Sequence, residues 1–189
     1  MNNTLIYLTG FPASGKLTIA KELCSQTGAF LIDNHTINDP VFQIVRKTGK
    51  DRLPEAIWEK ADLIRDVVLD TMAEIGAADA NFVMTNVLFN TPAGRKLFEK
   101  VRDTAKRRNA VFLPVELKCD ESIMLERVSN PEREKKLKLT ERKILHHTLS
   151  EYETLPFTHE NLITIDTGKH SPSESVSLIL EHIENLERP

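Results

Sequence analysis

The loop at residues 10–16 constrains this chain more than any other feature of its sequence. It reads Gly-Phe-Pro-Ala-Ser-Gly-Lys, and it lies between a short apolar run at residues 4–8 and an amphipathic helical pattern that stops near Gly28. Glycines near both ends of such a loop let backbone N–H groups converge on a phosphate at the N-terminus of the following helix. The lysine can then reach the outer phosphates of a nucleotide. The sequence therefore predicts a strand, a phosphate-binding loop and a helix.

The loop departs from the usual pattern at one position. Ser or Thr commonly follows the lysine, where its hydroxyl meets Mg²⁺, but here Leu17 follows Lys16 and Thr18 comes one residue later. We therefore expect the Thr18 hydroxyl to lie near phosphate or Mg²⁺, and the Leu17 side chain to pack against the sheet. The nucleotide-binding residues expected from the loop are Gly10, Ala13, Ser14, Gly15, Lys16, Leu17 and Thr18.

Composition excludes several classes of protein. A formal net charge of -3 does not fit a nucleic-acid-binding domain, which normally carries a strong basic excess. The longest apolar runs are shorter than the roughly 18 residues that a membrane span needs. Cys24 and Cys119 have no metal-ligand spacing and suit free thiols in a reducing cytosol. We expect a cytoplasmic monomer or homodimer with residues 1–189 in one domain.

Strand-like and helical segments alternate along the whole chain. Apolar strand-like runs lie at residues 4–8, 29–32, 81–86, 111–117 and 162–166, with helical patterns between them. Such alternation predicts an α/β fold in which helices cover both faces of a parallel sheet.

Prolines set three further expectations. Pro40 reads as the first residue of a short helix that ends near Gly49, and Pro54 opens a long helix with Ile75 on its buried face. Pro114 has no N–H for a sheet ladder, so we expect the fourth strand to bulge or to begin there.

Polar residues at the ends of the second and third strands are candidates for chemistry, because ligands of open α/β sheets bind beyond the carboxyl ends of the strands. Asp33 could accept the proton of an acceptor hydroxyl or hold Mg²⁺ through water; alternatively it only caps a turn. Asn34 and His35 follow it, and Asn86 ends the third strand. These three could position an acceptor, although turn-forming or surface roles are also open. The third strand lacks the aspartate that many proteins with this loop use to hold Mg²⁺.

The charged stretch at residues 127–143 is the last candidate region. Charge that develops on a transferring phosphoryl group needs fixed cations, and arginine offers paired planar donors. We therefore expect Arg127 and Arg133 to face that group, and the lysines of the stretch to be solvated. The stretch is poor in apolar anchors, so it is expected to form a mobile lid.

With these residues identified, the chain resembles the adenylate kinase and shikimate kinase group of small P-loop kinases. The resemblance rests on the GFPASGKLT loop, on Asp33 after the second strand, and on the segment that holds Arg127 and Arg133. The chain is also similar to bacterial proteins grouped with chloramphenicol phosphotransferase and zeta toxin. The resemblance implies a three-layer αβα fold with a five-stranded parallel sheet of order 2-3-1-4-5 and a helical lid. It also implies ATP with Mg²⁺ and direct phosphoryl transfer to a small molecule that carries a hydroxyl group.

Two departures leave the acceptor unidentified. Residues 85–87 read Thr-Asn-Val, which is neither the glycine triplet of shikimate kinases nor the Asp-Gly-Phe-Pro-Arg-like segment of nucleoside monophosphate kinases. A kinase of a metabolite or antibiotic is therefore one hypothesis, with Lys16, Asp33, Arg127 and Arg133 as its catalytic residues. A nucleotide-binding regulatory protein or ATPase without an acceptor is the alternative, as is a divergent nucleoside or nucleotide kinase.

Overall fold

A computed structural model describes residues 1–45, 53–131, 133 and 138–187, and it contains a five-stranded parallel sheet of order β2-β3-β1-β4-β5. The strands are β1 (Thr4–Thr9), β2 (Phe30–Asp33), β3 (Phe82–Asn86), β4 (Val111–Lys118) and β5 (Ile163–Asp166). The predicted fold class and strand order are therefore confirmed.

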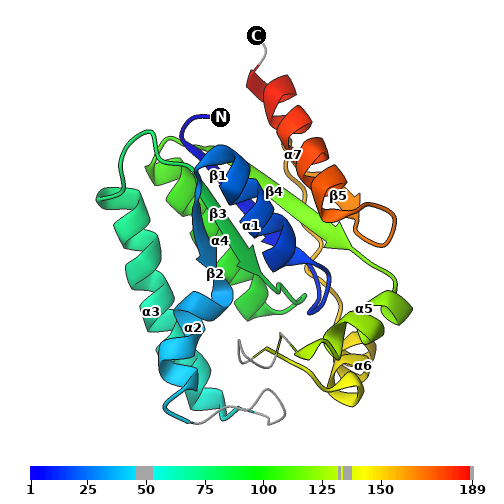
Figure 1. The fold of residues 1–189 in the computed structure, drawn as a ribbon. Helices are drawn as coiled ribbons and strands as arrows, with labels where there is room; N and C mark the ends of the chain where they lie inside the picture. The colour runs from blue at the N-terminus through cyan, green and yellow to red at the C-terminus, as the bar shows by residue number, and fades with distance from the viewer. Residues whose placement is uncertain (46–52, 132, 134–137, 188–189) are drawn as a thin grey trace.

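Helices cover both faces of the sheet (Figure 1). Ile6 and Leu8 of β1 face a core that includes α1 (Lys16–Thr27) and α7 (Pro172–Glu187). Leu5 and Tyr7 face the opposite core, which α3 (Glu55–Glu74) and α4 (Pro92–Arg107) complete. Successive side chains of a strand point to opposite faces, so one apolar run supplies both cores. Within the described residues, no helix combines the length and apolar character needed to cross a bilayer.

Three shorter helices lie at the end of the sheet where the strands have their carboxyl ends. They are α2 (Asn34–Phe42), α5 (Glu121–Val128) and α6 (Arg142–Glu151). A third apolar cluster holds α5 and α6 against the loop: Met124, Val128 and Leu145 are buried with Ala13 of the loop. Helices that come much later in the chain thus pack against the phosphate-binding loop.

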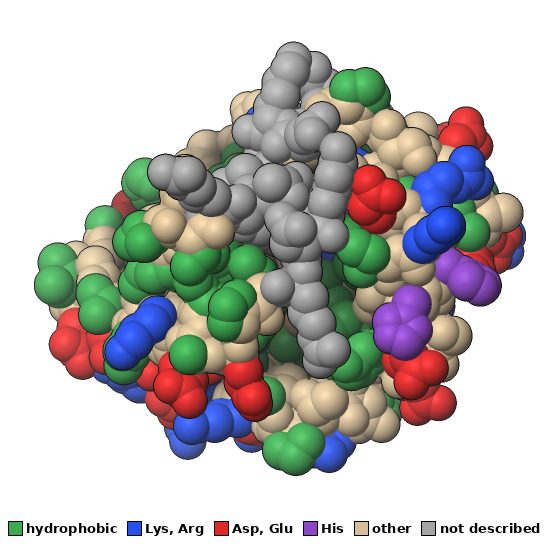
Figure 2. Space-filling model, turned by 90° about the horizontal axis from the view of Figure 1, so that it is seen from below, with side chains coloured by type: hydrophobic (Ala, Val, Ile, Leu, Met, Phe, Trp, Pro, Cys, Tyr) green, Lys and Arg blue, Asp and Glu red, His purple; other side chains and the backbone are tan. Residues whose placement is uncertain are grey.

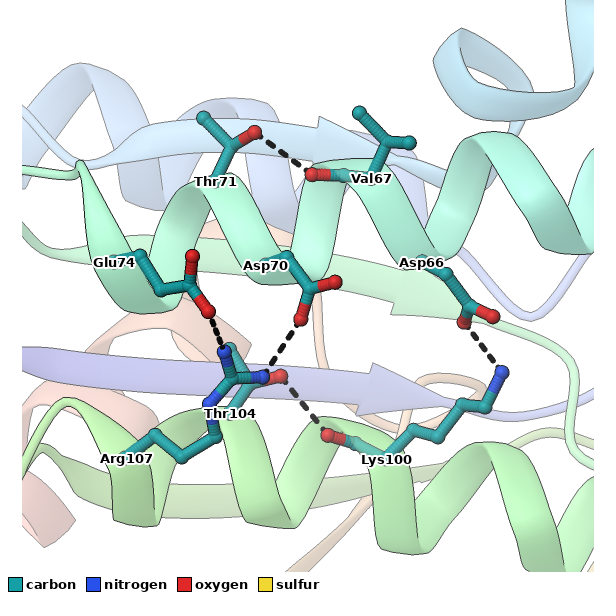
Figure 3. A network of polar contacts seen from close by, with 8 residues as sticks. All are labelled: Asp66, Val67, Asp70, Thr71, Glu74, Lys100, Thr104 and Arg107. Carbon is teal, nitrogen blue, oxygen red and sulfur yellow. Dashed lines mark hydrogen bonds and ion pairs between the residues drawn. The ribbon is translucent and has the colours of Figure 1, made fainter.

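Ion pairs connect α3 to α4 on the outer surface (Figure 3). Arg107 bonds Asp70 at 2.7 Å and Glu74 at 2.5 Å, and Lys100 pairs with Asp66. These side chains are partly or largely exposed, so water screens the pairs and their stabilising effect is small. They join the two helices that cover one face of the sheet.

The helix after β2 begins earlier than the sequence predicts. α2 spans Asn34–Phe42, so Pro40 lies inside the helix and not at its first position. An interior proline removes one helical hydrogen bond. Tertiary packing outweighs that loss, because Phe42 is buried and makes an edge contact with Trp58 of α3 at 5.2 Å between ring centroids. The expected end of this helix near Gly49 lies outside the described residues.

Two other expectations are wrong. β4 neither bulges nor begins at Pro114, which pairs in continuous register with Tyr7 of β1. β5 pairs with β4 only from Val115 onward, so the missing N–H of Pro114 costs no ladder bond on that side. Ile75 follows the last residue of α3 and is 78% exposed, so the buried face of the helix ends at Met72.

Candidate active site

The loop has the backbone geometry of a tight cradle between β1 and α1. Gly10 has a φ of 144° and Gly15 a φ of 92°. A Cβ at Gly10 would lie 2.5 Å from the carbonyl oxygen of Leu117, so only glycine fits there. Ala13 also has a positive φ, 67°, a strained conformation for a non-glycine residue that is typical of functional loops. α1 begins at Lys16, which leaves the first N–H groups of the helix at the loop.

Lys16 folds its side chain back into this loop. Its Nζ donates to the carbonyl oxygens of Gly10 at 2.8 Å and Phe11 at 2.7 Å, and to Ser14 Oγ at 3.3 Å. Burial lowers the pKa of Lys16 to about 7, with the positive charges of Lys138 and Arg133 adding to that effect and Asp33 opposing it. The ammonium therefore sits where additional negative charge would be strongly favourable.

The two residues after Lys16 differ from expectation in one respect. Leu17 is half-buried and belongs to none of the apolar clusters of the described residues, so the expected packing against the sheet is wrong. Instead it lies on the outer surface of α1 beside Thr18 and Lys21. Thr18 is exposed in the first turn of α1, where a metal or phosphate could reach its hydroxyl.

Thr167 supports the loop from the end of β5. Its Oγ1 donates to the carbonyl oxygen of Ser14 at 3.0 Å. Arg127 of α5 donates to Thr167 Oγ1 at 3.2 Å and to its carbonyl oxygen at 2.8 Å. The Arg127 guanidinium also lies 3.9 Å from the position of a Cβ at Gly15, so it stands beside the loop. Sequence reasoning assigned Thr167 no role.

Asp33 lies at the end of β2 and is 7% exposed. Thr85 Oγ1 donates to its Oδ1 at 2.5 Å, and Lys138 Nζ lies 3.4 Å from its Oδ2. Asp33 is the N-cap residue of α2, but its side chain makes no capping hydrogen bond. Helix capping therefore does not account for this carboxylate.

The expected lid segment is more anchored than its composition suggests. Arg127 lies in α5 and Lys143 in α6, so the connection between helices is shorter than residues 127–143. Leu139 packs against the cluster of Ala13, which supplies an apolar anchor that sequence reasoning missed. Lys138 was expected to be solvated, and this is wrong, because its side chain is 13% exposed and pairs with Asp33. Lys135 and Lys136 lie outside the described residues.

The candidate acceptor residues gather at the ends of β2 and β3. The Asn34 N–H donates to Thr85 Oγ1 at 3.3 Å, which ties α2 to β3. His35 Nδ1 lies 3.2 Å from Asp39 Oδ1 and stays partly exposed. Asn86 is 4% exposed, and its Nδ2 finds no hydrogen-bond partner among the described residues. Buried donors are normally satisfied, so Asn86 is a candidate donor to a ligand oxygen.

A buried arginine near these residues was missed by sequence reasoning. The buried residues of α3 are Ile57, Ala61, Arg65, Leu69 and Met72. Arg65 Nη2 donates to Asn38 Oδ1 at 3.1 Å and to Asn34 Oδ1 at 3.3 Å, and its Nη1 pairs with Asp62. It therefore holds the first turns of α2 in place. The available signal was a charged residue at the helical spacing of the apolar face.

Figure 2 shows this edge of the molecule from the side of α2, α5 and α6, with hydrophobic side chains around a hollow and charged side chains at the rim. Arg133 and Lys138 come from the connection between α5 and α6, while Asp33 comes from the far edge of the sheet. Among the described residues, the structure thus brings cations, a carboxylate and the polar side chain of Asn86 to the end of the sheet where the loop lies.

Comparison with known proteins places this geometry among related folds. Residues 5–154 match a family model described as an AAA domain. No curated protein matches the chain. Among solved structures, a gluconokinase from Sinorhizobium meliloti 1021 is 17% identical with a TM-score of 0.67, covering 97% of this chain and 93% of that chain.

Two further structures cover the chain to a similar extent. A shikimate kinase from Acinetobacter baumannii, solved with shikimate, is 21% identical with a TM-score of 0.55, covering 98% of this chain and 96% of that chain. The Mycobacterium tuberculosis APS kinase, solved with AMPPNP and APS, is 14% identical with a TM-score of 0.57, covering 97% of this chain and 98% of that chain. At such identities the similarity shows a common fold, and function must be argued from the site.

Proposed function

The chain belongs to the AAA domain family, and we propose that it is a kinase that transfers the γ-phosphoryl group of ATP to a hydroxyl group of a small molecule. One observation carries this proposal. The buried carboxylate of Asp33 ends β2 at the same end of the sheet as the phosphate-binding loop and acts electrostatically on Lys16. An ATPase needs the loop; a kinase also needs a group that can receive the proton of an acceptor hydroxyl.

The loop residues suit the phosphates of ATP. The N–H groups at the start of α1 and the buried ammonium of Lys16 offer donors and positive charge together. Gly10, Ala13 and Gly15 hold the backbone in the positive-φ conformations that let such donors converge. Arg127 and Arg133 add cations beside the loop, one fixed by Thr167 and one on the connection to α6.

The residues present also fit Mg²⁺, because Mg²⁺ that is bound to phosphates needs few protein ligands. Mg²⁺ usually keeps several waters and binds through few protein oxygens plus the phosphates of the substrate. The described residues hold no group of three or more His, Cys, Asp or Glu side chains that could bind a metal alone. The Thr18 hydroxyl would be its contact, and a contact through water to the Asp33 carboxylate is the alternative to the role of Asp33 as the base. When bound, the ion neutralises charge on the β- and γ-phosphate oxygens.

In the proposed reaction the acceptor oxygen attacks the γ-phosphorus as Asp33 receives the hydroxyl proton. The bond from the γ-phosphorus to the β–γ bridging oxygen breaks, and ADP leaves with that oxygen. Lys16 and Arg133 stabilise the charge that develops on the phosphoryl oxygens and on the leaving group. Catalysis of this kind rests mostly on positioning and charge, so a carboxylate of ordinary basicity suffices.

On the acceptor side, Asn34, His35 and Asn86 are proposed to hold the substrate. The unpaired Nδ2 of Asn86 would donate to an acceptor oxygen. The gluconokinase and the shikimate kinase among the structural neighbours support a small hydroxyl compound as the acceptor.

The test is a coupled assay of ADP release with purified protein, MgATP and a panel of hydroxyl compounds: sugars, sugar acids, nucleosides and aminocyclitols. We expect one class to raise ADP release far above the rate with water alone and to yield a phosphorylated product by mass spectrometry. A slow hydrolysis that no compound stimulates would favour the regulatory ATPase instead.

Nucleotide binding should also depend on pH through Lys16. Its pKa of about 7 means that the free protein loses this charge as the pH rises through neutrality. Bound phosphates favour the charged form, so above about pH 7 binding must take up a proton and the affinity falls by up to about tenfold per pH unit. Below that pH, Lys16 is already protonated and contributes no pH dependence.

Calorimetry near pH 8 in two buffers of different ionisation enthalpy measures this uptake directly. Wild-type protein should take up about one proton per nucleotide under these conditions. The Lys16→Arg variant is the matched control, because a guanidinium stays charged throughout and should take up none. Equal heats in the two buffers for the wild-type protein would contradict the expectation.

A further inference from the structure

The Lys138 side chain extends to Asp33, which ends β2. Its Nζ lies 3.4 Å from Asp33 Oδ2, and the two side chains are 13% and 11% exposed. Asp33 Oδ1 is already bonded to Thr85 at 2.5 Å. Oδ1 of the proposed base is therefore bonded to Thr85 and Oδ2 is paired with Lys138, so a hydroxyl group that approaches Oδ2 meets the Lys138 ammonium.

The backbone around Lys138 fixes where its side chain can reach. The Lys138 N–H donates to the carbonyl oxygen of Arg133 at 3.0 Å, and Arg133 Nε donates to the carbonyl oxygen of Leu139 at 2.9 Å. Leu139 in turn packs with the cluster that holds Ala13 of the loop. These two bonds connect Arg133 with Lys138 and Leu139, and both cations act electrostatically on Lys16 of the phosphate-binding loop.

Among the described residues, cations outnumber carboxylates around Lys16. Lys138 and Arg133 both act to lower the pKa of Lys16, and Asp33 acts to raise it. Burial lowers the pKa of Arg133 as well. Like charges held in a partly buried place repel one another, and a ligand with several negative charges relieves that repulsion. A triphosphate chain is such a ligand.

We infer that Lys138 is a phosphate-binding catalytic residue shared between two partners. Without nucleotide it pairs with Asp33, and with ATP in the loop it moves to the terminal phosphate. The move releases Asp33 Oδ2 from its ion pair, so the base is freed for the hydroxyl of the acceptor when the phosphoryl donor is in place. The inference rests on the proposed function and adds a coupling between its two substrates.

A double-mutant cycle tests this sharing. ATP and ADP affinities are measured by calorimetry in EDTA, so that no metal contributes, for the wild-type protein, Lys138→Met, Asp33→Asn and the double variant. Lys138→Met should weaken ATP binding by about 10-fold or more, the usual cost of a lost charged hydrogen bond. ADP lacks the terminal phosphate and should be affected less. Lys143→Met is the matched control, because that lysine is exposed on α6 and should leave both affinities unchanged.

The double-mutant cycle distinguishes a Lys138 that moves to ATP from a Lys138 that stays paired with Asp33. If ATP draws Lys138 away from Asp33, part of its binding energy breaks that ion pair. The loss caused by Lys138→Met should therefore be several-fold larger in the Asp33→Asn background than in the wild-type background, and Lys138→Arg should restore part of the affinity. Equal losses in the two backgrounds, or equal losses for ATP and ADP, would overturn the inference.

The Lys16→Ala variant distinguishes failure of this inference from failure of the proposed function. If Lys16→Ala abolishes ATP binding while the cycle is additive, the nucleotide site stands and Lys138 is only an ion-pair partner of Asp33. If wild-type protein binds no ATP, or binds it equally well without Lys16, the proposed function and the inference are both refuted. Circular dichroism spectra of all variants confirm that each is folded before affinities are compared.

Discussion

Replacement of Lys16 by alanine is expected to lower phosphoryl transfer by roughly 10²–10³-fold, the usual cost of removing one preorganised transition-state contact. The physical reason is position and charge together. The Lys16 ammonium lies inside the loop and donates to the carbonyl oxygens of Gly10 and Phe11. When nucleotide binds, the ammonium would exchange these neutral acceptors for the anionic oxygens of the outer phosphates. Initial rates of the purified variant, at saturating ATP and with the acceptor found in the screen, measure the effect.

The fold should survive this change. Burial holds the pKa of Lys16 at about 7, below its ordinary value of 10.5. The unfolded chain therefore binds more protons than the folded chain between these two values, and the lysine opposes folding at neutral pH. Lys16→Ala should not lower the melting temperature there. Lys21→Ala, an exposed lysine one turn later in α1, is the control and should keep full activity. A folded Lys16→Ala protein with the wild-type rate would refute the role of the loop.

Asp33→Asn is expected to cut turnover by about 10²–10⁴-fold, the typical contribution of general acid–base catalysis. The amide keeps the shape of the side chain and its bond to Thr85 but cannot take the hydroxyl proton. Affinity for MgATP should not fall, because the acidic group faces the acceptor. Turnover and nucleotide affinity are measured separately, with Asp70→Asn as the control, a remote carboxylate on the exposed face of α3.

The competing role for Asp33 is to hold the water shell of Mg²⁺. In that case the substitution would weaken ATP binding when Mg²⁺ is present and leave it unweakened in EDTA. Titration of the same variant with and without Mg²⁺ therefore decides between a base and a metal contact. Unchanged turnover together with unchanged affinity would remove Asp33 from the site.

Local sequence was sufficient for the parts of this protein whose signals are local. The loop at residues 10–16 was recognisable because its glycines, its lysine and its flanking strand and helix lie within one short segment. Alternation of apolar runs with helical patterns predicted the layered α/β fold, because a parallel sheet needs a crossover after every strand. The strand order came from the family resemblance and is confirmed.

Local signals were insufficient wherever tertiary packing outweighed them. Pro40 read as a helix start, but the burial of Phe42 against α3 carries the helix through it. Pro114 read as a strand break, but its place beyond the reach of β5 makes the missing donor harmless. A proline in the sequence shows which backbone N–H is missing. Only the neighbouring elements determine whether the fold needs the hydrogen bond of that N–H.

The candidate site shows the same division. The sequence by itself determined which residues end the strands, and so it identified Asp33 and Asn86. Both lie at the carboxyl ends of their strands, and the parallel topology brings these ends to the same side of the sheet. Only the tertiary structure determined their partners. Lys138 pairs with Asp33, and Arg65 holds α2, because the order of the strands and the packing of the helices bring together segments far apart in the chain. A charged residue far from its partner in sequence has no local pattern that distinguishes it from a solvated one, since desolvation and pairing arise only when the fold closes around both.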